Sequence, residues 1–152
     1  MVKPLAHVLY VEDQSTVAAI VSLEMEQSHI RVTTVPNGEA CLALVRELQF
    51  DLILLDQWLP GMDGLAICRH LKADPALQGI PIIFFTAFPS RYHGDEARRL
   101  GAADYLEKAM LGPRLTARIL AEVELARDRT KHPPRKAALN TERGTQPPHS
   151  EN

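Results

Sequence analysis

Short apolar runs alternate with helix-like segments along most of this 152-residue chain. Three of the runs are continuously apolar, which is typical of strands buried on both faces of a parallel sheet. Two weaker runs are shorter or rich in β-branched residues. The expected strands are residues 7–11, 31–35, 52–55, 80–85 and 103–106. This alternation restricts the chain to an α/β fold.

The segments after each run place apolar residues three to four positions apart, as an amphipathic helix does. Four of these segments begin with residues that favour a helix start. These residues are Ser15, Asn37, Asp63 and Pro113. Gly101 suits the end of the remaining helix. Five strand–helix pairs therefore predict a doubly wound α/β domain with a five-stranded parallel sheet, five helices and right-handed crossovers.

The composition changes near residue 128. Residues 131–152 contain four of the eleven prolines and almost no large apolar side chain. Such a segment cannot bury enough surface to offset the entropy lost on ordering. We therefore expect a folded domain over residues 1–128 and a disordered tail over residues 129–152.

Composition also excludes several classes of function. A formal net charge of -2 gives the chain no overall positive electrostatic field to attract nucleic acid. Aromatic residues make up only 5% of the chain, which leaves few rings for base stacking. No apolar stretch is long enough to cross a membrane, and the start does not resemble a secretory signal. Cys41 and Cys68 fall in expected helices and suit buried thiols in a reducing compartment. We expect a cytoplasmic protein that binds neither nucleic acid nor membrane.

Polar residues follow the expected strands at their carboxyl ends, where α/β sheets bind ligands. In chain order they are Glu12, Asp13, Asp56, Thr86 and Lys108. Clustered carboxylates repel unless a cation neutralises them, and oxygen ligands without His or Cys suit Mg²⁺. An Asp beside a metal and a lysine can attack phosphorus to form an acyl phosphate. Thr86 and Lys108 would then contact the phosphoryl oxygens.

The segments that carry these residues, YVED, LILLDQWLPGMDG, FFTA and GAADYLEK, closely resemble the receiver domain of two-component response regulators. The resemblance covers about residues 5–127 and implies a flavodoxin-like sheet with strand order 2-1-3-4-5. It implies that Asp56 is the phosphoacceptor and that Lys108 takes part in the reaction. It also implies that Thr86 is the switch hydroxyl and that Tyr105 is the aromatic residue that reorients on activation.

The same resemblance implies a Mg²⁺ site. Asp13 would bind the ion directly, and Glu12 would bind it through water. Asp56 and the backbone carbonyl of Trp58 would complete the protein's ligands.

The function that follows is a single-domain response regulator. It would receive a phosphoryl group from the phosphohistidine of a sensor histidine kinase, or from a phosphotransfer protein, onto Asp56 in a Mg²⁺-dependent reaction. It would not be an enzyme in the usual sense, because it would catalyse only its own phosphorylation and dephosphorylation. Its output would be contact with a downstream protein or onward phosphotransfer. A homodimer would use the face of the fourth helix, fifth strand and fifth helix.

Two features depart from the family pattern. Ala109 follows Lys108 where the family usually has a proline with a cis peptide bond, which leaves the reach of Lys108 open. Trp58 and Phe88 are bulky residues beside the path of water to the phosphoryl group. Their rings would either shield the acyl phosphate or turn outward to meet a partner.

Two other functions remain as alternatives. A pseudo-receiver would use the same fold as a phosphorylation-independent binding or dimerisation module, and only Ala109 favours it. A metal-dependent phosphatase or hydrolase of another α/β family ranks last. The residues after Asp56, Gln57 and Trp58, lack the second acid that such a nucleophile motif needs.

Overall fold

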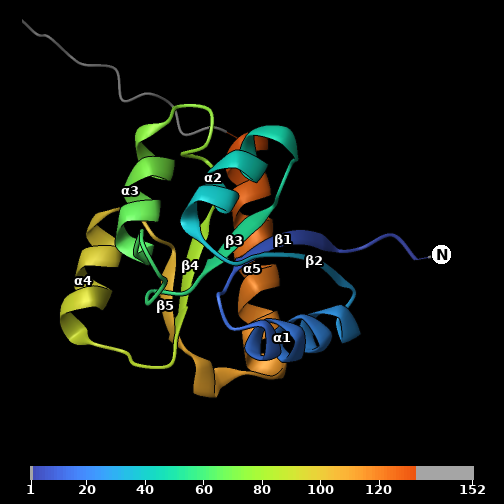
Figure 1. The fold of residues 1–152 in the computed structure, drawn as a ribbon. Coiled ribbons are helices and arrows are strands. Elements are labelled where there is room, and N and C mark those ends of the chain that lie inside the picture. Colours follow the sequence, from blue (N-terminus) through green and yellow to red (C-terminus); the bar gives the residue numbers. More distant parts are fainter. Residues whose placement is uncertain (1, 133–152) are drawn as a thin grey trace, which may run out of the picture.

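Five parallel strands form the centre of the computed structural model, which describes residues 2–132 (Figure 1). The strands are β1 (Ala6–Val11), β2 (Ile30–Val35), β3 (Leu52–Leu55), β4 (Ile82–Thr86) and β5 (Asp104–Glu107). They are arranged in the order β2-β1-β3-β4-β5. The predicted five-stranded parallel sheet and its strand order are therefore confirmed.

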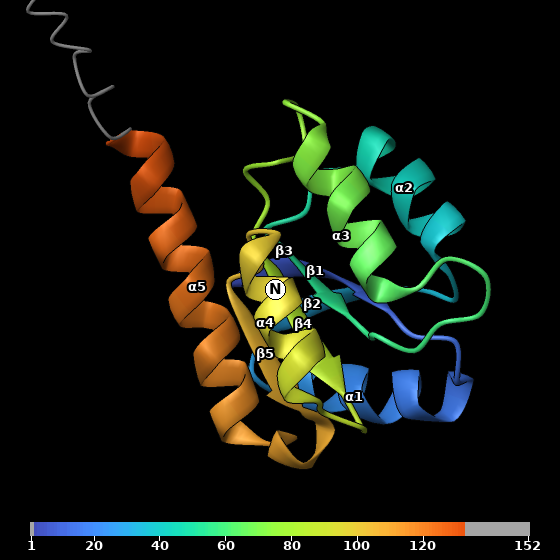
Figure 2. The same ribbon diagram turned by 90° about the vertical axis from the view of Figure 1, so that its left-hand side faces the viewer.

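Helices cover both faces of the sheet. They are α1 (Ser15–Gln27), α2 (Gly38–Glu47), α3 (Gly64–Ala73), α4 (Arg91–Arg99) and α5 (Pro113–Lys131). Buried residues of α1 and α5 pack together on one face, and those of α2, α3 and α4 share the other. Figure 2 shows α5 on one side of the strands and α2 and α3 on the other.

Short polar side chains begin three of the helices. Asn37, Asp63 and Ser90 each accept a hydrogen bond from a backbone N–H three residues further along, at the start of α2, α3 and α4. Each bond satisfies a donor that the first helical turn leaves free. Helix α1 differs, because Gln14 occupies the cap position and makes no side-chain cap bond.

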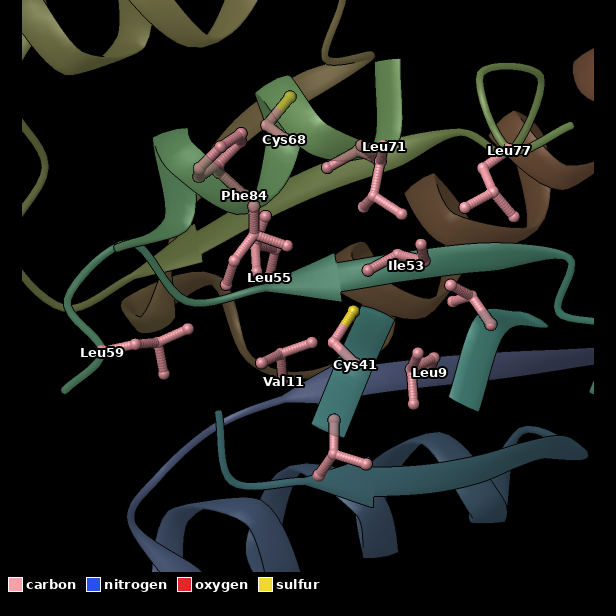
Figure 3. Close-up of a cluster of buried hydrophobic side chains, with 14 of the residues drawn as sticks. Leu9, Val11, Cys41, Ile53, Leu55, Leu59, Cys68, Leu71, Leu77 and Phe84 are labelled. Atoms are coloured by element: carbon pink, nitrogen blue, oxygen red, sulfur yellow. The ribbon is translucent and has the colours of Figure 1, made fainter. Parts of the chain in front are cut away.

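The core consists of two apolar layers separated by the sheet. Strand β3 contributes to both, because successive side chains point to opposite faces. Ile53 and Leu55 lie in the layer under α2 and α3, which also holds Cys41 and Cys68 (Figure 3). All four residues of β3 are fully buried. Burial of each such side chain stabilises the fold by roughly 1.5–3 kcal/mol, so the carboxyl end of β3 is held rigidly.

The folded region extends slightly beyond its expected limit. The boundary expected at residue 128 lies inside α5, which continues to Lys131. The rest of the predicted tail, residues 133–152, lies outside the described residues. Within residues 2–132, no helix has both the length and the apolar character that crossing a membrane requires.

Candidate functional site

Two neighbouring strands bring three carboxylates together. Val11 and Leu55 end β1 and β3 opposite one another, and the amide of Asp56 donates to the Val11 carbonyl at 3.1 Å. The residues that follow these strand ends are Glu12, Asp13 and Asp56. One carboxylate oxygen from each lies within 4.8 Å of the others. The spacing and the all-oxygen donor set fit a hard divalent cation that retains several waters.

Lys108 joins two of these carboxylates. Its ammonium lies 2.6 Å from Oε2 of Glu12 and 3.2 Å from Oδ2 of Asp56. Glu12 is buried and also accepts hydrogen bonds from the Tyr10 hydroxyl at 3.2 Å and the Gln14 amide at 3.2 Å. Asp13 is exposed. A buried ion pair therefore borders a carboxylate that faces water.

The position of Lys108 answers the question raised by Ala109. No cis peptide bond occurs in the part of the chain that the structure describes. A short 3₁₀ helix spans Lys108–Met110, and α5 begins at Pro113 as expected. Gly112 precedes it with φ 135°, a conformation that favours glycine. The loop without proline still lets Lys108 contact Asp56.

Burial makes ionisation of Asp56 costly. Desolvation raises the pKa of its carboxyl from 3.8 to about 6, although the Lys108 ammonium lowers the pKa and the nearby Glu12 raises it. The remaining oxygen, Oδ1, accepts a hydrogen bond from the Trp58 amide at 3.3 Å. Asp56 thus presents a carboxylate whose negative charge a cation would stabilise strongly.

Thr86 ends β4 and is fully buried. Its Oγ1 accepts a hydrogen bond from the Phe88 amide at 3.2 Å. The hydroxyl proton is not used in this bond and is free to be donated. The parallel pairing of β3 with β4 continues as far as Leu55 opposite Phe84. Thr86 therefore ends the strand that lies directly beside Asp56.

Tyr105 lies in β5, partly buried, and makes two hydrogen bonds through its hydroxyl. The hydroxyl donates to Oε1 of Gln57 and accepts from the amide of Ser90 at 3.2 Å. Burial raises the pKa of Tyr105, and the Ser90 amide opposes this rise. The hydroxyl therefore remains a donor at neutral pH.

The two bulky residues beside the site face the surface. Phe88 is 73% exposed and Trp58 is 50% exposed. The Trp58 indole meets the His93 ring edge to face, with 5.1 Å between ring centroids. Trp58 therefore packs against the start of α4, and Phe88 lies at the surface.

The structure brings Glu12, Asp13, Asp56, Lys108 and the backbone of Trp58 to one edge. Thr86 lies at the end of β4, which is next to β3, and Tyr105 lies on β5, which is next to β4. The contacts missed from the sequence include the Tyr10 hydroxyl on Glu12, the Gln57 side chain on Tyr105, and the Ser90 amide on Tyr105. Only Gln57 carried a signal, because a polar residue two positions after a fully apolar, buried strand has few ways to reach water.

Known proteins resemble this chain in sequence and in fold. A family model described as the response regulator receiver domain matches residues 8–120. The chain is 33% identical over 114 residues to the response regulator PleD of Caulobacter vibrioides, covering 75% of this chain and 25% of PleD. It is 34% identical over 116 residues to the DNA-binding response regulator MtrA of Mycobacterium tuberculosis, covering 76% of this chain and 50% of MtrA. It thus spans half or less of the length of these relatives.

Solved structures show the same architecture. The BeF3-activated N-terminal receiver domain of RstA from Klebsiella pneumoniae superposes with a TM-score of 0.72 at 29% sequence identity. The match covers 77% of this chain and 97% of the RstA chain. The described fold is therefore similar to a solved receiver domain over nearly the whole of that domain.

Proposed function

The chain belongs to the response regulator receiver domain family, and from this membership we propose that Asp56 accepts a phosphoryl group in a Mg²⁺-dependent transfer from a phosphohistidine. The donor would be a sensor histidine kinase or a phosphotransfer protein. The observation that carries the proposal is the contact of Lys108 with both Glu12 and Asp56, next to the exposed Asp13. This arrangement combines a nucleophile, a cation and an oxygen-rich metal site within one edge.

Residues of this chain fit Mg²⁺. Asp13 and Asp56 would bind the ion with the backbone carbonyl of Trp58, and Glu12 would hold a bound water. When bound, the ion would neutralise negative charge on the carboxylates and on the incoming phosphoryl oxygens.

The transfer itself requires little from the protein beyond positioning and charge. A carboxylate oxygen of Asp56 forms the new bond to phosphorus while the phosphorus–nitrogen bond of the donor breaks. The electron pair of that bond stays with the imidazole nitrogen. The Lys108 ammonium offsets the negative charge of the phosphoryl oxygens. The Thr86 hydroxyl donates to one of them, because its proton is free in the unphosphorylated state.

We propose two partners besides the donor. The kinase would contact α1, which begins two residues after Asp13 and on which Ile20 and Leu23 are 54% and 60% exposed. A downstream protein, or a second copy of the chain, would meet the face formed by α4, β5 and α5. The buried free cysteines Cys41 and Cys68 suit the reducing cytoplasm, which we propose as the location of the protein.

Intact-mass spectrometry after incubation with acetyl phosphate tests the proposal. We expect one added phosphoryl group with Mg²⁺ present and none with excess EDTA. Asp56→Asn should abolish the gain, while Asp95→Asn, at an exposed site on α4, should retain it. A wild-type protein that gains no phosphoryl group with Mg²⁺ present would favour a pseudo-receiver. A gain that persists in Asp56→Asn would contradict the assignment of the phosphoacceptor.

A further inference from the structure

Gln57 and Trp58, the two residues that follow Asp56, are each linked to Ser90 by a separate series of contacts. Gln57 is buried and Trp58 is half exposed, yet both are connected through one intermediate residue to Ser90. Ser90 is the cap of α4, and its side chain accepts a hydrogen bond from the His93 amide at 3.3 Å. The start of α4 is therefore linked twice to the loop that carries the phosphoacceptor.

The buried route passes through Tyr105. Gln57 is 1% exposed, and its Oε1 accepts the hydrogen bond of the Tyr105 hydroxyl. The same hydroxyl accepts the Ser90 amide at 3.2 Å. Packing against Phe84, with 6.0 Å between ring centroids, restrains the ring of Tyr105. The bond to Gln57 fixes where the hydroxyl points.

Burial of the Gln57 amide lowers the stability of the folded protein. The Nε2 atom of Gln57 is buried and has no hydrogen-bond partner among the described residues. A buried unpaired donor costs free energy that an apolar side chain of similar size would avoid. The side chain of Gln57 is therefore better explained by the bond it offers to Tyr105 than by a contribution to packing.

The exposed route passes through His93. The Trp58 indole contacts the His93 ring, and Nδ1 of His93 lies 2.9 Å from Oγ of Ser90. The buried route thus ends at the backbone amide of Ser90, and the exposed route ends at its side chain. A displacement of the loop after Asp56 would pull on both groups at once.

We propose that Gln57 is a positioning residue that holds Tyr105, and through it the start of α4, at a fixed place relative to Asp56, with Trp58 and His93 as the outer contact. Its consequence for signalling rests on the proposed phosphorylation of Asp56. Phosphorylation changes the charge and the hydrogen bonds of the carboxylate that precedes Gln57 in the chain. The change reaches α4 through Gln57 as well as through Thr86.

Hydrogen exchange of the Ser90 amide, followed by NMR in the unphosphorylated protein, tests the positioning directly. Gln57→Met removes the acceptor of the Tyr105 hydroxyl and keeps the side-chain length. We expect it to speed exchange at Ser90 about fivefold, the factor that corresponds to about 1 kcal/mol. Tyr105→Phe should speed it at least as much, and the double variant no more than Tyr105→Phe alone. Gln78→Met, at an exposed position, is the matched control and should leave the rate unchanged.

Two results would overturn the inference. One is a Ser90 rate in Gln57→Met that stays within twofold of the wild type while Tyr105→Phe speeds it. The other is a double variant whose effect is the product of the two single effects, because independent groups combine in that way.

The signalling consequence has its own measurement. Beryllofluoride with Mg²⁺ should change the Ser90 exchange rate in the wild type, and Gln57→Met should reduce this change at least twofold. An unreduced change would contradict transmission through Gln57 while leaving the proposed function intact. A wild type that neither responds to beryllofluoride nor accepts a phosphoryl group would contradict the proposed function, and the unphosphorylated Ser90 rates would still decide the positioning role.

Discussion

At the scale of single residues, the carboxylates of Glu12, Asp13 and Asp56, here called the acidic edge, destabilise the folded protein. Asp56 is buried beside Glu12, and the Lys108 ammonium contacts both carboxylates. Desolvation and mutual repulsion both oppose the ionised form of Asp56. A site that binds a cation or a phosphoryl group must tolerate this repulsion when empty.

Replacing Asp56 should therefore stabilise the protein. The folded-state pKa of about 6 lies above the ordinary value of 3.8, so the folded protein holds this proton more tightly than the unfolded chain. The favourable contribution is complete below pH 3.8 and is lost as the pH rises through 6. Asp56→Asn should increase the free energy of unfolding by roughly 1–2 kcal/mol at pH 7 and by much less at pH 4. Urea denaturation without divalent cations measures both, and an equal gain at both pH values would contradict this account.

Removing the cation should have the opposite effect. Lys108→Met leaves two buried carboxylates facing each other, so we expect the free energy of unfolding at pH 7 to fall by roughly 1–3 kcal/mol. Lys131→Met, at an exposed position near the end of α5, is the control and should cost little. Combining Lys108→Met with Asp56→Asn should recover most of the loss, because the repulsion then disappears. Urea denaturation of the four proteins gives the coupling, and strictly additive effects would show that the contacts are independent.

At the scale of helices and strands, continuous apolar runs predicted the three central strands, and weaker runs predicted the two edge strands β2 and β5. The expected run over residues 52–55 coincides with β3, because a strand buried on both faces has no polar residue to confuse its limits. The run over residues 80–85 is shifted to Ile82–Thr86 in β4. Apolarity alone could not reveal that the threonine after the run continues the strand.

Strand ends also predicted which side chains gather at the acidic edge, since parallel strands align their carboxyl ends. Side-chain partners were not predictable in the same way. Whether Glu12 faces a metal, water or Lys108 depends on rotamers and on a loop shape that the spacing of residues does not fix. The buried bond between Gln57 and Tyr105 joins residues 48 positions apart and has no local pattern.

The junction of β3 and α3 offers a test at this scale. Gly64 begins α3, where an added Cβ would lie 2.6 Å from the Asp56 carbonyl oxygen and 2.8 Å from Cα of Gln57. Both atoms belong to the backbone, so the loop after Asp56 would have to shift. Gly64→Ala should destabilise the protein by roughly 2 kcal/mol or more and slow labelling by acetyl phosphate.

Gly79→Ala is the matched control, because a Cβ there meets no atom within 4 Å. Thermal unfolding and intact-mass labelling of the two variants provide the measurement. Equal stability and equal labelling would show that α3 moves away from Asp56 without cost.

At the scale of the whole molecule, the acidic edge and the core are parts of one cooperative structure. Glu12 and Asp56 directly follow β1 and β3, and Thr86 ends β4. These are the three central strands, and apart from the partly buried His7 all their residues are buried. A ligand that binds the edge of the folded protein, and not the unfolded chain, stabilises the entire domain by mass action. Metal binding should therefore be visible as a change in global stability.

Mg²⁺ provides the corresponding prediction. At ten times its dissociation constant, a cation bound only by the folded state adds about 1.4 kcal/mol, which raises the unfolding midpoint of a domain of this size by about 4 °C. Asp13→Asn removes the exposed carboxylate that we propose as a ligand and creates no cavity. It should leave the midpoint without Mg²⁺ nearly unchanged and abolish the rise. Glu47→Gln, an exposed carboxylate at the end of α2, should retain the full rise. Scanning calorimetry with and without millimolar Mg²⁺ measures all three, and a rise of equal size in Asp13→Asn would place the cation elsewhere on the molecule.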